Sequence, residues 1–140
     1  MVKILAGKEG SGKTKHLLKM ANEKVASTTG NIVYLDSDKR HIYDLKHEIR
    51  FLNMEEFPIE KPEEFVGFLC GIISNDYDIE TIFVDGLYNM VDMNEIDALA
   101  CINKLENIAK KFDIEFRIGM NYSGKEVSPE IQKYLFNPED

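Results

Sequence analysis

The chain has 140 residues, 44% of them hydrophobic, which suits a single domain over 1–140 with a core of its own. Its formal net charge of −8 argues against nucleic acid as the main partner, because neutralising a phosphate backbone takes clustered lysines and arginines. The apolar runs are shorter than the ~18 residues that a membrane span needs. No signal-peptide pattern opens the sequence, and we expect a cytoplasmic protein.

The first elements in chain order alternate between strand and helix. VKILA (2–6) is a short apolar run bounded by glycine, which is typical of a buried strand. NIVYLD (31–36) is rich in β-forming residues and predicts a second strand. The segment 37–60 is ambiguous, and we expect a helical turn over 41–47 followed by a short edge strand. A helix over 13–26 is indicated by apolar residues at helical spacing: Leu17, Leu18, Ala21 and Val25.

The second half of the chain continues the alternation. Pro62 followed by two glutamates predicts a helix start, and this helix should extend to Asn75. ETIFVD (80–85) predicts a third strand, and Asn94 can cap the next helix, with Asp97 three residues on. The residues expected on one face of that helix are Ile96, Leu99, Ile102, Leu105, Ile108 and Phe112. The remaining elements are a fourth strand over 114–120, a helical turn from Ser128, a fifth strand over 133–136 and a frayed tail over 137–140.

This alternation predicts an α/β fold. We expect three α/β/α layers, with a mainly parallel five-stranded sheet and helices on both faces. Ligands should bind at the carboxyl ends of the strands. Cys70 and Cys101 fall in predicted helices without any metal-binding spacing, so we expect two buried free thiols.

The loop after the first strand carries the strongest functional signal. GKEGSGKT (7–14) matches the phosphate-loop pattern G-x-x-x-x-G-K-[ST] at every fixed position. Its backbone N–H groups and the following helix N-terminus can hold phosphate. Lys13 would bridge the β- and γ-phosphates, while Thr14 would bind Mg²⁺. The predicted nucleotide-binding residues of this segment are Gly7, Lys8, Glu9, Gly10, Ser11, Gly12, Lys13, Thr14 and Lys15.

Two further features concern the metal and the base. Asp85 ends an apolar strand, as expected for a Walker-B aspartate that binds the metal or one of its waters. Thr14 and Asp85 are therefore the predicted metal-binding residues. NKLE (103–106) is close to a guanine-reading motif but ends in glutamate and lies within a predicted helix, which leaves adenine, and hence ATP, as the expected base.

Longer runs of the chain resemble a known family. YLDSDKRHIYDLKHEIRFLNMEE (34–56) and IFVDGL (82–87), together with the loop, resemble small stand-alone RecA-type P-loop ATP-binding proteins. Some members are loosely labelled twitching-motility ATPases. The resemblance covers nearly the whole chain and implies a P-loop NTPase with strand order 5-1-4-3-2. It also implies that Asn121 and Ser123 contact the γ-phosphate as a polar sensor. Lys125 could add positive charge nearby, although we expect a solvated loop lysine.

Hydrolysis needs a group that orients or deprotonates water. The residue after Asp85 is Gly86, so a glutamate is absent there. In RecA-type enzymes the carboxylate follows the strand after the phosphate-loop helix, where this chain has Asp36 and Asp38. With Lys13 they are the candidate catalytic residues, although an aspartate is one methylene shorter than glutamate. A purely structural role for both aspartates in a turn stays open.

Three functions follow from these features. The favoured one is a Mg-ATP-binding ATPase or ATP-dependent switch with slow hydrolysis, since no arginine finger is evident. The second is a non-catalytic nucleotide-binding protein with a protein partner or self-association. Its acidic residues could bind a basic partner: Glu55, Glu56, Glu60, Glu63 and Glu64. The third is a small nucleotide or nucleoside kinase, which the few arginines and the absence of a lid-length insertion disfavour.

Overall fold

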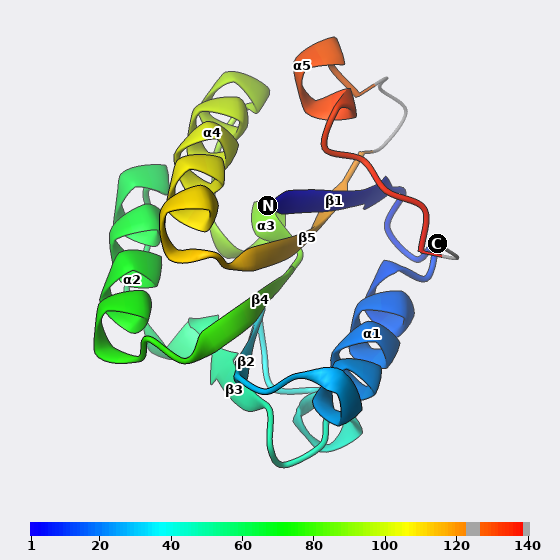
Figure 1. Cartoon of the computed structure of the whole chain (residues 1–140). Coiled ribbons are helices and arrows are strands. Elements are labelled where there is room, and N and C mark those ends of the chain that lie inside the picture. Colours follow the sequence, from blue (N-terminus) through cyan, green and yellow to red (C-terminus); the bar gives the residue numbers. More distant parts are fainter. Residues whose placement is uncertain (123–126, 139–140) are drawn as a thin grey trace.

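The computed structural model, which describes residues 1–122 and 127–138, contains a five-stranded parallel sheet (Figure 1). Its order is β1-β5-β4-β2-β3, and each of the four strand pairings is parallel. The α/β class and the parallel sheet are therefore confirmed. The strands are β1 (Val2–Gly7), β2 (Asn31–Asp36), β3 (Arg50–Asn53), β4 (Ile79–Asp85) and β5 (Glu115–Asn121).

Helices lie on both faces of this sheet. The first long helix, α1 (Lys13–Ser27), packs on one face, while α2 (Pro62–Asn75) and α4 (Glu95–Phe112) pack on the other (Figure 1). This arrangement agrees with three α/β/α layers. Shorter elements complete the chain: η1 (Ile42–Asp44), η2 (Met54–Glu56), α3 (Leu87–Met90) and α5 (Pro129–Gln132).

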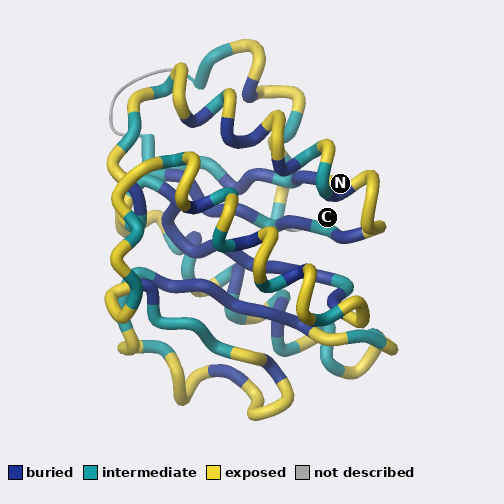
Figure 2. Tube along the Cα trace, turned by 90° about the vertical axis from the view of Figure 1, so that its left-hand side faces the viewer, coloured by how far each residue is buried: buried dark blue, intermediate teal, exposed yellow. Residues whose placement is uncertain are grey.

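Two apolar clusters fill the spaces between the layers, because side chains alternate between the two faces of a strand. The larger cluster joins β1, β2, β4 and β5 to α2 and α4. The smaller cluster joins Tyr34 of β2 and Phe83 of β4 to Leu17 and Ala21 of α1. Figure 2 shows the buried positions along the strands and the inner sides of the helices. The face under α1 therefore has less apolar cover than the opposite face.

Most predicted elements are confirmed to within a residue or two. The helix over Pro62–Asn75 and the strand over Asn31–Asp36 have the predicted bounds. Asn94 caps α4, since its side chain accepts a hydrogen bond of 2.8 Å from the Asp97 backbone N–H. The expected helical turn over 41–47 is shorter, at Ile42–Asp44, and α3 has no counterpart among the predicted elements.

The strand order differs from the predicted 5-1-4-3-2 at its edges. The predicted fifth strand, 133–136, is reduced to one isolated parallel bridge between Leu135 and Ile4. The N–H groups of Tyr134 and Leu135 donate to the carbonyls of Ile131 and Gln132, so the turn after α5 uses them. The sheet's fifth strand is β3, which confirms the short edge strand expected after 41–47 and pairs with β2 at the opposite edge. The predicted frayed tail falls partly on residues 139–140, which lie outside the described residues.

Two expectations about helix faces are confirmed only in part. Cys101 is buried, but Cys70 is exposed, because it follows the buried Leu69 by one residue and so lies ~100° further round α2. On α4, Ile96 is 80% exposed and Phe112 is 41% exposed. Ile102 and Leu105 of the predicted face are buried, and the buried face of α4 also includes Ala98, Cys101 and Ala109. Among the described residues, no helix is both long enough and apolar enough to cross a membrane.

Candidate functional site

The loop between β1 and α1 is compact because its glycines permit the required backbone. Gly10 and Gly12 have φ angles of 80° and 94°, in the left-handed region that other residues rarely adopt. A Cβ atom at Gly7 would lie 2.8 Å from Ser11 Oγ, which is too close without a shift. The local sequence therefore folds into a loop whose backbone can approach a ligand closely.

Lys13 lies at the centre of this loop. Its Nζ atom donates hydrogen bonds to Gly7 O (3.1 Å), Lys8 O (2.5 Å) and Ser11 Oγ (3.2 Å). Burial lowers the pKa of Lys13, while the charges of Asp85 and Glu9 oppose that shift. A bound anion would compete with the neutral loop oxygens for this ammonium group. Its hydrogen bond to the ammonium group would be stronger than those of the loop oxygens, because both partners would be charged.

The N-terminus of α1 is open to an anion. Gly12 occupies the N-cap position without a side-chain hydrogen bond, and the first turn contains no acidic residue. The first N–H groups of a helix have no partner within it, and they attract negative charge. In a 15-residue helix that follows a glycine loop, this end suits phosphate.

Asp85 links the loop to the carboxyl end of β4. Its Oδ1 atom accepts a hydrogen bond of 3.1 Å from Thr14 Oγ1, across 71 residues of sequence. Its Oδ2 atom accepts a hydrogen bond of 2.7 Å from the buried Tyr34 hydroxyl. Both oxygens of Asp85 are therefore held in place.

Tyr34 is a residue that sequence reasoning missed. Its ring is fully buried and stacks on Phe51 and Phe83. Burial raises the pKa of Tyr34, and the charge of Asp85 raises it further, so the phenol stays protonated and donates. The available signal is its position two residues before Asp36, which places both side chains on one face of β2.

The two candidate catalytic aspartates differ in their surroundings. Asp36 is in register with Asp85, is only 5% exposed, and accepts a bond of 2.7 Å from the Ser37 N–H. Its Oδ2 atom has no hydrogen-bond partner among the described residues. Burial, followed by the charge of Asp85, raises the pKa of Asp36 to about 6. The backbone N–H and side chain of Arg40 instead bond Asp38 and lower its pKa.

A cavity of about 260 Å³ lies beside the loop. It is lined by Glu9, Gly10, Gly12, Lys13, Thr14, Asp85, Gly86 and Asn121. Sites that enclose a whole drug-sized ligand measure ~300–1,000 Å³. This cavity is smaller, and its size suits the phosphate chain of a nucleotide better than the whole nucleotide. Every lining residue except Gly86 is among the predicted site residues. The available signal for Gly86 was its place after Asp85 in an Asp-Gly pair at the end of a strand, and its φ in the structure is 88°.

The other predicted site residues lie outside this lining. Gly7, Lys8 and Ser11 contact the Lys13 ammonium group. Lys15 lines a different cavity along α1. Within the described ranges, neither Asp36 nor Asp38 lines the loop cavity. Ser123 and Lys125 of the predicted sensor segment lie outside the described residues.

The residues present fit a weakly ligated magnesium ion. In residues 1–122 and 127–138, no group of three or more His, Cys, Asp and Glu side chains gathers to hold a metal. Mg²⁺ keeps several waters and is often bound by one or two protein groups together with substrate phosphates. The Thr14 hydroxyl and the Asp85 carboxylate suit such a partial set of oxygen ligands.

Comparison with known proteins adds no assignment. A scan against protein-family models finds no match, and a search of curated proteins finds none either. The resemblance to small RecA-type proteins therefore stays a prediction.

Proposed function

We propose that this chain is a Mg-ATP-binding RecA-type P-loop protein that acts as an ATPase or ATP-dependent switch with slow intrinsic hydrolysis. The observation that carries this proposal is the Thr14–Asp85 hydrogen bond beside the glycine loop. It joins two separate sequence signals at one cavity, at the carboxyl ends of parallel strands, where α/β proteins bind ligands.

Each residue has a defined role in this proposal. The N–H groups of the loop and of the first turn of α1 bind the phosphate oxygens. The Lys13 ammonium group releases its present loop partners and donates to the phosphate oxygens instead. Thr14 and Asp85 would hold Mg²⁺, which supplies charge neutralisation of the phosphates when bound. Asn121, which is in register with Gly7 at the end of β5 and lines the loop cavity, would bond the terminal phosphate.

Asp36 is the better candidate for a general base. Its Oδ2 atom is free of described partners, whereas Arg40 occupies Asp38. A carboxyl group whose pKa is raised to about 6 suits proton transfer near neutral pH. Asp36 does not line the loop cavity, however, so an attacking water would have to lie between the Asp36 carboxylate and the phosphate bound in that cavity. This separation supports slow hydrolysis.

The same separation favours a second candidate, a non-catalytic nucleotide-binding protein. It would present its nucleotide-dependent conformation to a protein partner or to another copy of itself. The start of α2 offers an acidic surface for a basic partner, since Glu63 and Glu64 are exposed. Measurable hydrolysis of ATP to ADP and phosphate by the pure protein would exclude this candidate.

The test is ATP binding by a Lys13→Ala variant, measured by calorimetry with Mg²⁺ present. Removing a charged hydrogen-bond donor from the phosphates should weaken binding by about 10- to 100-fold. Lys110→Ala, at an exposed position on α4, is the matched control and should bind as the wild type does. Unchanged ATP affinity in a Lys13→Ala protein with a normal thermal melt contradicts the proposal.

A further inference from the structure

A second and larger cavity, of about 600 Å³, lies along α1 on the face of the sheet that α1 covers. α1 forms one wall, and side chains of β4, β5 and the C-terminal segment complete the lining. Its exposed apolar surfaces come from Met20 and Pro138, while Phe83 in its lining is fully buried. Its volume falls within the ~300–1,000 Å³ typical of small-molecule sites.

The charge of this cavity is opposite to that of the whole protein. Its lining contains four cationic side chains, Lys15, Lys19, Lys24 and Arg117, but one carboxylate, Glu23. The chain as a whole has a net charge of −8. A concave surface lined by one sign of charge concentrates ligands of the other sign.

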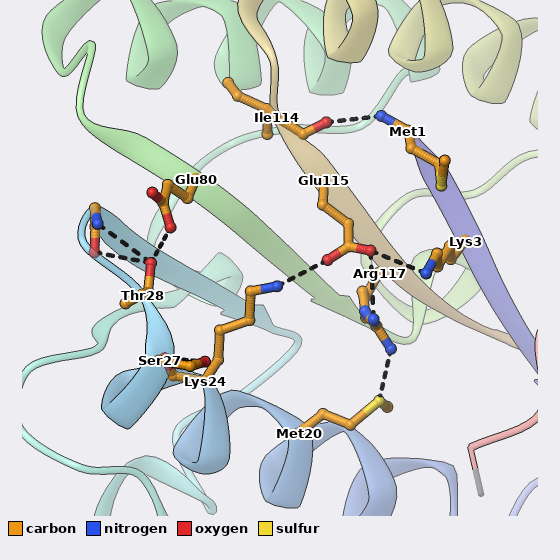
Figure 3. A network of polar contacts seen from close by, with 11 residues as sticks. Met1, Lys3, Met20, Lys24, Ser27, Thr28, Glu80, Ile114, Glu115 and Arg117 are labelled. Carbon is orange, nitrogen blue, oxygen red and sulfur yellow. Dashed lines mark hydrogen bonds and ion pairs between the residues drawn. The ribbon is translucent and has the colours of Figure 1, made fainter. Parts of the chain in front are cut away.

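A neighbouring carboxylate does not neutralise this excess. Glu115 bonds three cations at once, at 3.3 Å from Lys3 Nζ, 3.1 Å from Lys24 Nζ and 3.3 Å from Arg117 Nη2 (Figure 3). Burial raises the pKa of Glu115, but the bond from Lys24 and the charges of Arg117 and Lys24 outweigh it and bring the pKa to about 2. Lys3 lies outside the cavity lining, so the one charge of Glu115 is set against two of the four lining cations, Lys24 and Arg117, and a positive excess remains.

The Arg117 guanidinium has unused hydrogen-bonding capacity. Its Nη1 atom donates to the Met20 sulfur at 3.0 Å, and a thioether is a weak acceptor (Figure 3). Its Nε atom is buried and lacks a partner in the part of the chain that the structure describes. The Phe136 ring lies 5.0 Å from the guanidinium and holds it in the cavity wall. An anionic oxygen would be a better partner than sulfur.

We propose that the α1 cavity binds a small organic anion, with a carboxylate or phosphate group facing Arg117, Lys19 and Lys24 and an apolar body on Met20 and Pro138. The lining of this cavity shares no residue with that of the loop cavity. The inference therefore stands independently of the proposed nucleotide site.

The experiment is an amide NMR titration of the full chain with three probes of similar size: phenyl phosphate, benzoate and benzyl alcohol. We expect both anions to shift the amides of Lys19, Met20 and Arg117, and benzyl alcohol to leave them unchanged. Tighter binding of phenyl phosphate assigns a phosphate ligand, and tighter binding of benzoate assigns a carboxylate. Shifts confined to Gly10 and Gly12, or equal binding of benzyl alcohol, overturn the proposal.

Variants separate this cavity from the rest of the surface. Lys19→Glu, at an exposed position, should weaken anion binding about fivefold or more through charge reversal. Lys110→Glu makes the same charge change on α4 and should have no effect. Arg117→Lys keeps the charge but removes the planar guanidinium, so binding should weaken while the thermal melt reports on folding. Anion affinity that is unchanged in Lys19→Glu overturns the proposal.

A Lys13→Ala background distinguishes the two sites. The proposed α1 cavity should keep its anion affinity in this variant, which should lose ATP affinity. Loss of the Lys19, Met20 and Arg117 shifts in a folded Lys13→Ala protein would assign the probes to the loop and overturn the proposal. ATP binding measured in Lys19→Glu completes the comparison, and it should remain.

Discussion

At the scale of single residues, Tyr34 connects the packed interior to the candidate metal site. Its ring is held between Phe51 and Phe83, and its hydroxyl holds one oxygen of Asp85. The other oxygen bonds Thr14. Mutation of a group that orients a metal ligand in this way typically lowers metal affinity by about 10- to 100-fold.

We therefore expect Tyr34→Phe to weaken the Mg²⁺-dependent part of ATP binding about tenfold, because Asp85 loses a fixed orientation. Calorimetry with Mg²⁺ and with EDTA separates this part from binding of the free nucleotide. Tyr43→Phe is the control, since Tyr43 is 96% exposed. Equal weakening with and without Mg²⁺ would indicate a general loss of structure and contradict a role in positioning Asp85.

The ionised Asp36 carboxylate should lower the free energy of unfolding at neutral pH. Its pKa is about 6 in the folded chain, above its ordinary value, so ionisation is harder in the folded state than in the unfolded one. The free energy of unfolding therefore falls as pH rises from the ordinary value through about 6. Replacing the group with neutral asparagine removes this dependence.

The Asp36→Asn variant should be more stable than the wild type by about 2–3 kcal/mol above about pH 7, and this gain should vanish near pH 4. Urea unfolding in EDTA without nucleotide measures the difference at both pH values. Asp38→Asn is the control, and its effect on stability should have the opposite sign. Bonds from Arg40 lower the pKa of Asp38, so replacing this carboxylate should destabilise the protein above about pH 4. A difference for Asp36→Asn that is independent of pH contradicts the expectation.

At the scale of elements, local chemistry made most of the fold predictable. The helix over Pro62–Asn75 begins with proline and two glutamates, and its Glu64 side chain accepts a bond from the Lys61 N–H. The predicted strand over 133–136 is wrong because the turn after α5 uses the backbone N–H groups of Tyr134 and Leu135, which a strand would have needed for pairing. Ile96 and Phe112 were misplaced because the small residues Ala98 and Ala109 allow close packing on the buried face of α4.

The candidate site was predictable only in part. The glycine loop encodes Lys13 and Thr14 locally, and the end of an apolar strand marks Asp85. The contact of Tyr34 with Asp85 depends on the parallel pairing of β2 with β4, which no local pattern specifies. The α1 cavity likewise depends on Arg117 of β5 lying beside α1, which only the folded chain reveals.

At the scale of the whole molecule, the arginines lie away from the candidate phosphate site. The chain contains Arg40, Arg50 and Arg117, all within the described ranges, and none of them lines the loop cavity. Arg40 bonds Asp38, Arg50 is exposed on the edge strand β3, and Arg117 bonds Glu115. An arginine supplied to the transition state accelerates phosphoryl transfer by ~10³–10⁵-fold.

The isolated chain should therefore hydrolyse ATP slowly, on the order of 10⁻³ s⁻¹ or less in a single-turnover assay with excess protein. The rate per molecule should stay constant on dilution if no second copy contributes a group to the site. A rate that rises with protein concentration would indicate that self-association supplies the missing charge. Lys110→Ala should match the wild type, whereas Lys13→Ala should show no turnover above the uncatalysed background. Rapid hydrolysis by a protein shown to be monomeric would contradict this account, because the described residues offer the transition state no positive side chain except Lys13 at the cavity lining.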